Sequence, residues 1–298
     1  MSTDRLVYRQ YTQEELDRQY NVRLGIPNFQ AYFDRFSTLA EAFRRSVAIQ
    51  ADLPYGDHPL QTLDYFPAAA AADAGNAPLL LFIHGGYWRS LDKSDFSHVA
   101  ASFVAAGINV ALINYRLAPQ ATMDETTGDC RAALHYLVQQ ASSLRFDPNQ
   151  MHLAGHSAGG HLTAALAGAT ASQPDAFPAL RSICCISGLY DLQPVALSYL
   201  NQDLHLREAE IDAHSPLQHL PASTTQVILT VGGRESDAFH DQQHRYAQAL
   251  TACGMTPRIV TLPAAHHLDV IDVLADGNSE LTRAMHEAIQ ACRVKAGT

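Results

Sequence analysis

The sequence predicts an α/β fold with one mostly parallel central sheet and helices on both faces of that sheet. Short apolar runs recur along the chain and alternate with longer segments of helical periodicity. Of the 298 residues, 47% are hydrophobic and 17% are charged, so the chain can bury a core and is not of the disordered type. No internal repeat or shift in composition divides it. A single domain over residues 1–298 is therefore expected.

The first sixty or so residues are expected to form a helical segment near the ligand-binding edge of the sheet. Thr12 is followed three residues later by Glu15, a capping-box pattern that predicts the start of a helix ending near residue 20. Residues 29–46 predict a second helix with aromatic side chains on one side. The alanine-rich residues 68–75 are interpreted as a surface turn.

The central part of the chain carries the signals of the sheet. Continuously apolar runs of this length are typical of strands that are buried on both faces. The predicted strands are residues 79–83, 108–115, 151–154, 182–187, 226–231 and 258–262. The predicted helices are residues 94–105, 126–140, 159–169, 238–253 and 279–292, with a helical excursion at 193–223. Right-handed crossovers would place the carboxyl ends of these strands at one edge, where open α/β folds bind ligands.

Charge and cysteine content exclude several classes of protein. The chain has 20 Lys and Arg against 30 Asp and Glu, a formal net charge of −10, which argues against a nucleic-acid partner. No run approaches the roughly 18 apolar residues of a membrane span, and no signal peptide is recognisable. The five cysteines lack regular spacing, which favours reduced thiols. We therefore expect a cytoplasmic protein with a small-molecule substrate and no membrane contact, and a homodimer is left open.

A nucleophile motif lies between a predicted strand and a predicted helix. The residues Gly155-His156-Ser157-Ala158-Gly159 match the pattern G-x-S-x-G. A strand before the motif and a small-residue helix after it supply the setting of a nucleophile elbow. Ser157 is therefore the predicted nucleophile, and the backbone N–H of Ala158 is a predicted donor to a developing oxyanion.

A second motif, His84-Gly85-Gly86-Tyr87-Trp88, directly follows the first strand of the predicted parallel sheet. An oxyanion hole needs backbone N–H groups that approach the substrate without interference from side chains. The N–H groups of Gly86 and Tyr87 are the predicted donors, and His84 is interpreted as an anchor of the loop. Trp88 is predicted to border the substrate pocket, with a place in the core as the alternative.

Together the two motifs resemble those of the kynurenine formamidase (arylformamidase) family of α/β-hydrolases. Residues 16–21, 52–56 and 187–192 are also similar to segments of that family. The resemblance spans nearly the whole chain. It implies an α/β-hydrolase fold and a metal-independent serine hydrolase that cleaves an aryl formamide such as N-formyl-kynurenine. A carboxylesterase, or a hydrolase of another amide or a carbamate, is the alternative, and a non-catalytic binding protein of this fold is a third reading.

In α/β-hydrolases the chain order is nucleophile, acid, histidine. Two carboxylates, Glu235 and Asp237, follow the predicted strand at residues 226–231. The family pattern here is an acidic residue, then Ser, two variable residues and Phe. Ser236 and Phe239 match its Ser and Phe, so the resemblance implies that Glu235 is the acid. The family usually has Asp at this position, so Asp237 stays open as the alternative.

The predicted general base comes after the last predicted strand. His266 and His267 are adjacent there, and the family pattern of His, a bulky apolar residue and Asp implies His267. His266 receives no role. Ser157, His267 and the acid would then act as a catalytic triad.

Tyr190 and Phe239 lie just past predicted strand ends and are predicted to contribute to substrate binding, with ordinary packing as the alternative. His240 and His244 have a spacing that two metal ligands could use, but they lack an H-E-x-x-H pattern. No metal and no organic cofactor is therefore expected.

Overall fold

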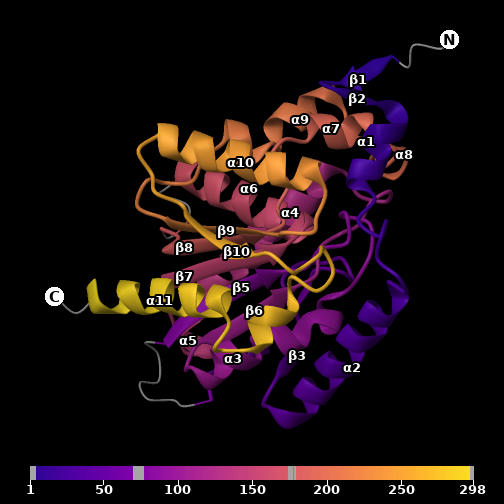
Figure 1. Cartoon of the computed structure of the whole chain (residues 1–298). Coiled ribbons are helices and arrows are strands. Elements are labelled where there is room, and N and C mark those ends of the chain that lie inside the picture. Colours follow the sequence, from indigo (N-terminus) through magenta and orange to yellow (C-terminus); the bar gives the residue numbers. More distant parts are fainter. Residues whose placement is uncertain (1–4, 70–76, 174–176, 178, 296–298) are drawn as a thin grey trace.

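The computed structural model describes residues 5–69, 77–173, 177 and 179–295 (Figure 1). Residues 70–75 of the predicted turn lie outside these ranges. An eight-stranded sheet has the spatial order β10 (Arg258–Leu262), β9 (Gln226–Gly232), β8 (Ser182–Ile186), β7 (Phe146–His156), β5 (Ala77–Ile83), β6 (Asn109–Ile113), β4 (Thr62–Phe66) and β3 (Gln50–Pro54). A two-stranded antiparallel sheet consists of β1 (Leu6–Tyr8) and β2 (Tyr11–Thr12).

Helices cover both faces of the large sheet, and the predicted fold class is confirmed. In Figure 1, α4, α6 and α10 lie on one face and α3 and α11 on the other. The α-helices are α1 (Gln13–Tyr20), α2 (Gln30–Ser46), α3 (Ala101–Ala105), α4 (Met123–Gln139), α5 (Ala141–Leu144), α6 (Ala158–Ser172), α7 (Gln193–Leu197), α8 (Asn201–Leu204), α9 (Glu208–Ala213), α10 (Asp237–Ala252) and α11 (Glu280–Lys295). The 3-10 helices are η1 (Lys93–Ala100), η2 (Pro216–Gln218) and η3 (Asp272–Ala275).

All six strands predicted from apolar runs are present, and they pair in parallel. The sequence did not predict β3 and β4, which extend the sheet in the antiparallel sense. Asp64 interrupts the apolar pattern of β4, yet its side chain is fully buried. Arg44 bonds this carboxylate, and Lys93 lies 3.3 Å from it. A buried charge of this kind is tolerated because it is paired.

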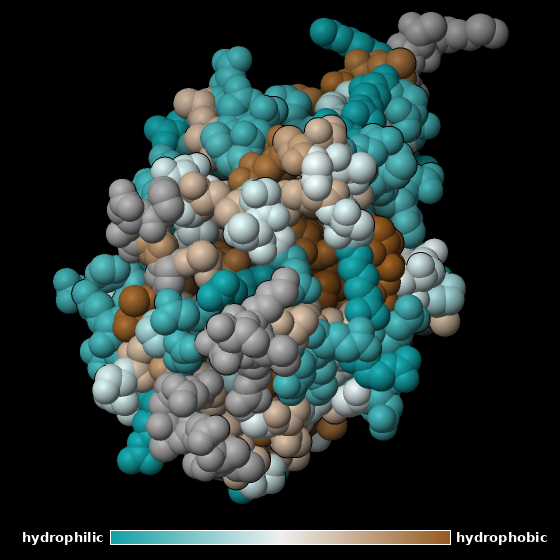
Figure 2. All heavy atoms as spheres, turned by 90° about the vertical axis from the view of Figure 1, so that its left-hand side faces the viewer, coloured by the Kyte–Doolittle hydropathy of each residue, from teal (hydrophilic) through white to brown (hydrophobic). Residues whose placement is uncertain are grey.

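The N-terminal segment lies beside the carboxyl ends of the parallel strands. In Figure 1 the indigo chain leads from α1 at the upper right to α2 at the lower right. Residues 21–25, between these helices, line the same cavity as Ser157. Figure 2 shows a different face, turned toward the left of Figure 1, where hydrophilic side chains cover most of the surface and hydrophobic ones show mainly in recesses.

The turn after β6 supports the glycine loop that follows β5. The hydroxyl of Tyr115 donates to the backbone carbonyl of His84 at 2.9 Å, and the two rings stack with centroids 4.6 Å apart. The N–H of Ala118 donates to the carbonyl of Trp88 at 2.8 Å. The glycine loop is thus held by hydrogen bonds at both of its ends.

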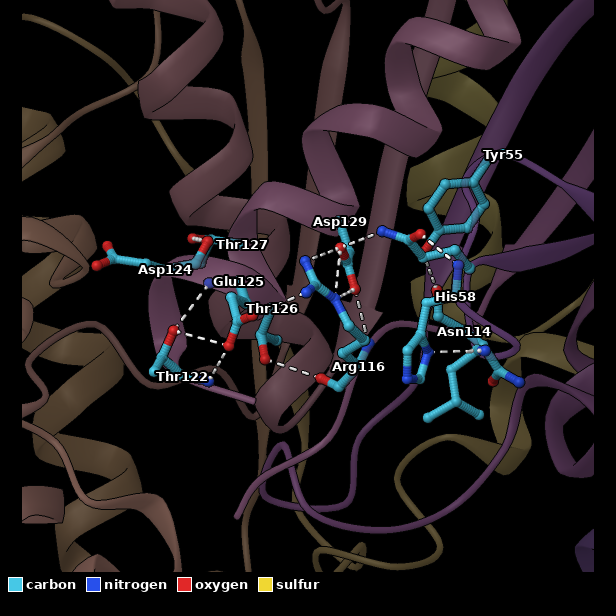
Figure 3. Close-up of polar contacts among 12 residues, drawn as sticks. Tyr55, His58, Asn114, Arg116, Thr122, Asp124, Glu125, Thr126, Thr127 and Asp129 are labelled. Atoms are coloured by element: carbon cyan, nitrogen blue, oxygen red, sulfur yellow. Dashed lines mark hydrogen bonds and ion pairs between the residues drawn. The ribbon is translucent and has the colours of Figure 1, made fainter. Parts of the chain in front are cut away.

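Arg116 fixes this turn to α4, as Figure 3 shows. Its guanidinium donates to both carboxylate oxygens of Asp129, at 2.9 Å from Nε and 2.8 Å from Nη2. Asp129 also accepts from the Gln61 side chain at 2.7 Å, and the Arg116 carbonyl accepts from the Thr126 hydroxyl at 2.8 Å. A bidentate pair with a buried carboxylate has a fixed geometry. The network therefore gives the glycine loop a rigid support.

Candidate active site

Ser157 lies at the sharp turn between β7 and α6, as the motif predicts. Its backbone has φ of 57° and ψ of −119°, a conformation that side-chain-bearing residues rarely adopt. The Ser157 N–H donates to the carbonyl of Ile186 at 2.8 Å, which ties the turn to β8. A Cβ atom on Gly159 would lie 1.9 Å from the carbonyl oxygen of Ile83, so this close approach requires glycine.

The structure brings Ser157, His267 and Glu235 into one hydrogen-bonded chain. Ser157 Oγ lies 2.9 Å from His267 Nε2, and His267 Nδ1 lies 2.5 Å from Glu235 Oε2. Since an ionised carboxylate can only accept, Nδ1 donates to Glu235 and Nε2 accepts the Ser157 hydroxyl. This is the geometry that a nucleophile, a base and an orienting acid require.

Glu235 is held as a carboxylate by its surroundings. Burial alone would raise the pKa of this carboxyl, but the charge of His267 and the hydrogen bonds that Glu235 accepts hold the pKa below its usual value. Two of these bonds reach Oε1, from Ser187 Oγ at 2.5 Å and from the N–H of Gly232 at 2.7 Å. Oε2 is thereby oriented toward the imidazole.

The two alternatives for acid and base lie elsewhere. Asp237 is exposed at the first position of α10 and has no hydrogen bond to His267 among the described residues. The Nε2 atom of His266 lies 3.0 Å from the hydroxyl of Tyr32 and 3.3 Å from Asp269 Oδ2. His266 therefore fastens α2 to this loop and does not contact the serine.

The glycine loop presents backbone groups to the same cavity. Gly86 has φ of 109° and Tyr87 has φ of 50°, so the chain turns away from β5 in left-handed conformations. Both residues line the cavity, and within the described part of the chain their N–H groups donate to no other group. The Tyr87 hydroxyl donates to the carbonyl of Tyr20 at 2.7 Å, which fixes the loop from the side of α1. The N–H of Ala158 starts α6, where helical N–H groups lack partners within the helix.

A cavity of about 580 Å³ opens above Ser157 and His267. One wall is aromatic and comes from Phe29, Phe33 and Phe36 of the N-terminal segment, with Phe96 from η1. These side chains form a slot of a size suited to a small aromatic molecule.

Of the three residues predicted to bind substrate, one lies at the site. The ring of Phe239 lies 4.8 Å from that of His267 and lines an adjoining cavity of about 380 Å³. Trp88 is 1% exposed and donates from Nε1 to His161 at 3.1 Å. Tyr190 is fully buried and stacks on Tyr246 at 4.1 Å. The assignment of Trp88 and Tyr190 to the substrate-binding wall is thus corrected: strand-end positions brought them near the site, but both side chains turn into the core.

Sequence reasoning missed several residues of the site. Ser187 was noted only as part of a family segment, although it bonds the candidate acid. His156, the variable residue of the motif, packs 4.8 Å from the His267 ring, and burial, with the charge of His267, lowers its pKa to about 3. His156 therefore stays neutral near pH 7. The sequence placed residues 29–46 near the ligand-binding edge and predicted one aromatic side, but it did not show that this side faces Ser157.

Within residues 5–69, 77–173, 177 and 179–295, no helix is long and apolar enough to cross a membrane. Nor do the described His, Cys, Asp and Glu side chains gather in a group of three or more that could hold a metal ion.

The fold and the geometry of this site define an α/β-hydrolase. The chain belongs to the BD-FAE family, whose model matches residues 64–237. It is 29% identical over 294 residues to a kynurenine formamidase from Danio rerio, covering 95% of this chain and 98% of that protein. It is also 25% identical over 274 residues to an isoprenylcysteine alpha-carbonyl methylesterase from Arabidopsis thaliana, covering 83% of this chain and 63% of that protein.

Among solved structures, a candidate thioesterase from Silicibacter sp. tm1040 has a TM-score of 0.80 and 30% sequence identity, covering 91% of this chain and 99% of that chain. The relationship to kynurenine formamidases that the motifs indicated is confirmed by these similarities. The chain is an enzyme of the α/β-hydrolase class.

Proposed function

We propose that this enzyme is a serine hydrolase that cleaves the amide bond of an aryl formamide such as N-formyl-kynurenine. The observation that carries the proposal is the chain of hydrogen bonds from Ser157 through His267 to Glu235 at the base of an aromatic cavity. The full-length similarity to kynurenine formamidases supports the choice of substrate.

The reaction begins at Ser157. His267 Nε2 takes the hydroxyl proton while Oγ forms a bond to the formyl carbon. The electron pair of the carbonyl moves to its oxygen, and a tetrahedral oxyanion results. Glu235 keeps the imidazole in the required tautomer and stabilises the imidazolium that forms.

The oxyanion is stabilised by backbone N–H groups of Gly86, Tyr87 and Ala158. Their donors are fixed in place before substrate binds, so stabilisation requires no reorganisation during the reaction. When the oxyanion collapses, the carbon–nitrogen bond breaks and His267 gives its proton to the aniline nitrogen. Water then attacks the formyl-serine by the same steps, and formate and free Ser157 result.

Hydrolysis of a carboxylic ester is the second candidate function. The similarity to a methylesterase favours it, since ester and formamide hydrolysis use the same nucleophile, base and oxyanion donors. An ester has a better leaving group, so esterase activity needs less assistance from His267 as an acid.

The test is hydrolysis of N-formyl-kynurenine, followed by formate release, beside hydrolysis of p-nitrophenyl acetate. We expect both activities to depend on Ser157, with Ser157→Ala lower by at least about 10⁴-fold. A fluorophosphonate should label the wild type and not this variant. Turnover of the ester without the formamide would select the second function, and no labelling of Ser157 would contradict both.

A further inference from the structure

The charges that line the candidate cavity are opposite in sign to those of the whole chain. The chain carries a formal net charge of −10. Among the described residues that line the cavity there is no Asp or Glu, but there are two arginines, Arg23 and Arg89. Glu235 lies behind His267, where it is bound by Ser187 and Gly232. A ligand in the cavity therefore meets positive charge.

Of the two arginines that line the cavity, Arg23 is the one without a carboxylate partner among the described residues. Within the described part of the chain its side chain forms no ion pair. The guanidinium lies over the rings of Phe29 and Phe33, with its carbon 4.8 Å and 5.9 Å from the ring centroids. Contact with a ring face uses the π-surface of the guanidinium and leaves its N–H groups directed outward as donors.

Arg89 and Tyr199 extend this positive region. Arg89 is half-buried, forms an ion pair with Asp203, and lies over the Tyr199 ring at 6.0 Å. Burial raises the pKa of the Tyr199 phenol, and the charges of Arg89 and Arg23 act in the opposite direction. Arg23, Arg89 and Tyr199 all line the cavity, and Arg89 lies directly over the Tyr199 ring.

The cavity has a buried end and an exposed end. Ser157 and His267 are 3% and 5% exposed, whereas Arg23 is exposed to solvent. The aromatic wall of Phe29 and Phe33 lies beneath the Arg23 guanidinium. A substrate would therefore place its reacting carbonyl at the buried end, its ring against the aromatic wall and its remaining substituent near the cation.

We propose that Arg23, assisted by Arg89 and Tyr199, binds a carboxylate of the substrate, so that this site selects aromatic formamides whose side chain carries a carboxylate. The inference rests on the proposed function for the reacting bond, but the binding of the anion does not depend on turnover. Arg23 is thereby a specificity-determining residue that acts on substrate binding and leaves the chemical step unchanged.

The first experiment measures binding alone. The ligands are 3-benzoylpropionate, which has an aromatic ketone and a carboxylate but no scissile bond, and 3-benzoylpropionamide, which lacks only the charge. By calorimetry we expect the acid to bind the wild type about five- to tenfold more tightly than the amide, the range of a partly exposed ionic contact. Arg23→Gln should remove this preference. Arg45→Gln is the matched control, since Arg45 is an exposed residue of α2 that pairs with Glu41 and does not line the cavity.

Equal affinity for acid and amide, an unchanged preference in Arg23→Gln, or no binding of the acid at millimolar concentration would each overturn the proposal. The second experiment compares hydrolysis of N-formyl-kynurenine with that of its carboxamide. We expect Arg23→Gln to raise KM for N-formyl-kynurenine about five- to tenfold with little change in kcat, and not to raise KM for the carboxamide, which has no carboxylate for Arg23 to bind. If neither formamide is hydrolysed while the acid still binds preferentially through Arg23, the proposed reaction fails and the anion site stands. If both are hydrolysed equally well by wild type and variant, the reaction stands and the anion site fails.

Discussion

Replacing Glu235 by Gln tests the candidate triad most directly, because its neighbours determine how the new amide must lie. Oε1 accepts from Ser187 at 2.5 Å and from the N–H of Gly232 at 2.7 Å, while Oε2 accepts from His267 at 2.5 Å. The amide oxygen can satisfy the two donors only if it takes the Oε1 position. The NH₂ group then faces His267 Nδ1, which must accept. The imidazole proton moves to Nε2, where it prevents uptake of the Ser157 proton.

The size of the effect follows from this geometry. The opposite orientation of the amide would direct its NH₂ at the N–H of Gly232, which has no acceptor capacity, and would leave that donor unsatisfied at a cost of about 1–3 kcal/mol. The variant therefore keeps the wrong tautomer of His267. A triad with the wrong tautomer loses about 10⁴-fold in kcat, which corresponds to about 5 kcal/mol of transition-state stabilisation.

The assay is kcat for N-formyl-kynurenine and for p-nitrophenyl acetate, with thermal unfolding to confirm that the variant is folded. Asp237→Asn is the matched control, since Asp237 is an exposed carboxylate two residues away. We expect it to retain activity within about twofold, as is usual for an exposed side chain without a contact to the site. A loss of less than about tenfold in Glu235→Gln, or a larger loss in Asp237→Asn, would contradict the proposed role of Glu235 as the acid.

Three further predictions follow from the structure. Burial lowers the pKa of six described histidines, His84, His98, His152, His156, His161 and His286. The pKa is about 4 for His98 and about 3 for His152, His156 and His161, against an unfolded value near 6.5. Each of these four therefore contributes stability that is full above pH 6.5 and is reduced by about 2 kcal/mol at pH 5. Acid titration of unfolding should show this loss, and His98→Phe should reduce its slope. In Gly86→Ala the new Cβ would lie 2.1 Å from the Ser90 carbonyl oxygen, so the loop that carries the proposed oxyanion donors must move. We expect kcat to fall at least about 10²-fold, and an unchanged kcat would contradict the role of Gly86 as an oxyanion donor. Finally, a chelator should not change the rate, because each proposed step uses groups of the chain; loss of activity restored by a divalent metal would disprove that.

The parts of the site that the sequence predicts are those whose chemistry is local. Ser157 and the glycine loop are recognisable because a sharp turn after a strand needs glycines at fixed spacing. The choice between Glu235 and Asp237, and between His266 and His267, is not local in this sense. It depends on which side chain reaches another loop. The contacts that favour Glu235 and His267 join residues that are 32 and 110 positions apart in the chain.

The same distinction explains the errors in the fold. β4 was missed because Asp64 looks like a surface residue, and only Arg44 and Lys93, from distant segments, make its burial acceptable. Trp88 was expected at the pocket because it belongs to the glycine-loop motif, and Tyr190 because it follows a strand end, with packing in the core as the alternative for each. Which way a side chain turns there depends on partners such as His161 and Tyr246, and the sequence gives no sign of that pairing.

Helix α1 connects the parts of the site that act on the two ends of a substrate. The second half of this helix accepts three hydrogen bonds from the loops around the site. Ser236 Oγ, next to Glu235, donates to the Gln19 carbonyl at 2.6 Å, and the Tyr87 hydroxyl of the glycine loop donates to the Tyr20 carbonyl at 2.7 Å. The N–H of Tyr199, which lines the cavity, donates to Asp17 Oδ1 at 2.7 Å. Arg23 follows directly in the chain. A shift of this segment would therefore move the proposed anion-binding group, the oxyanion donors and the acid loop together. Because reacting groups must be held within a fraction of an ångström, the proposed mechanism requires the N-terminal segment to be held as firmly as the loops that carry Ser157, Glu235 and His267.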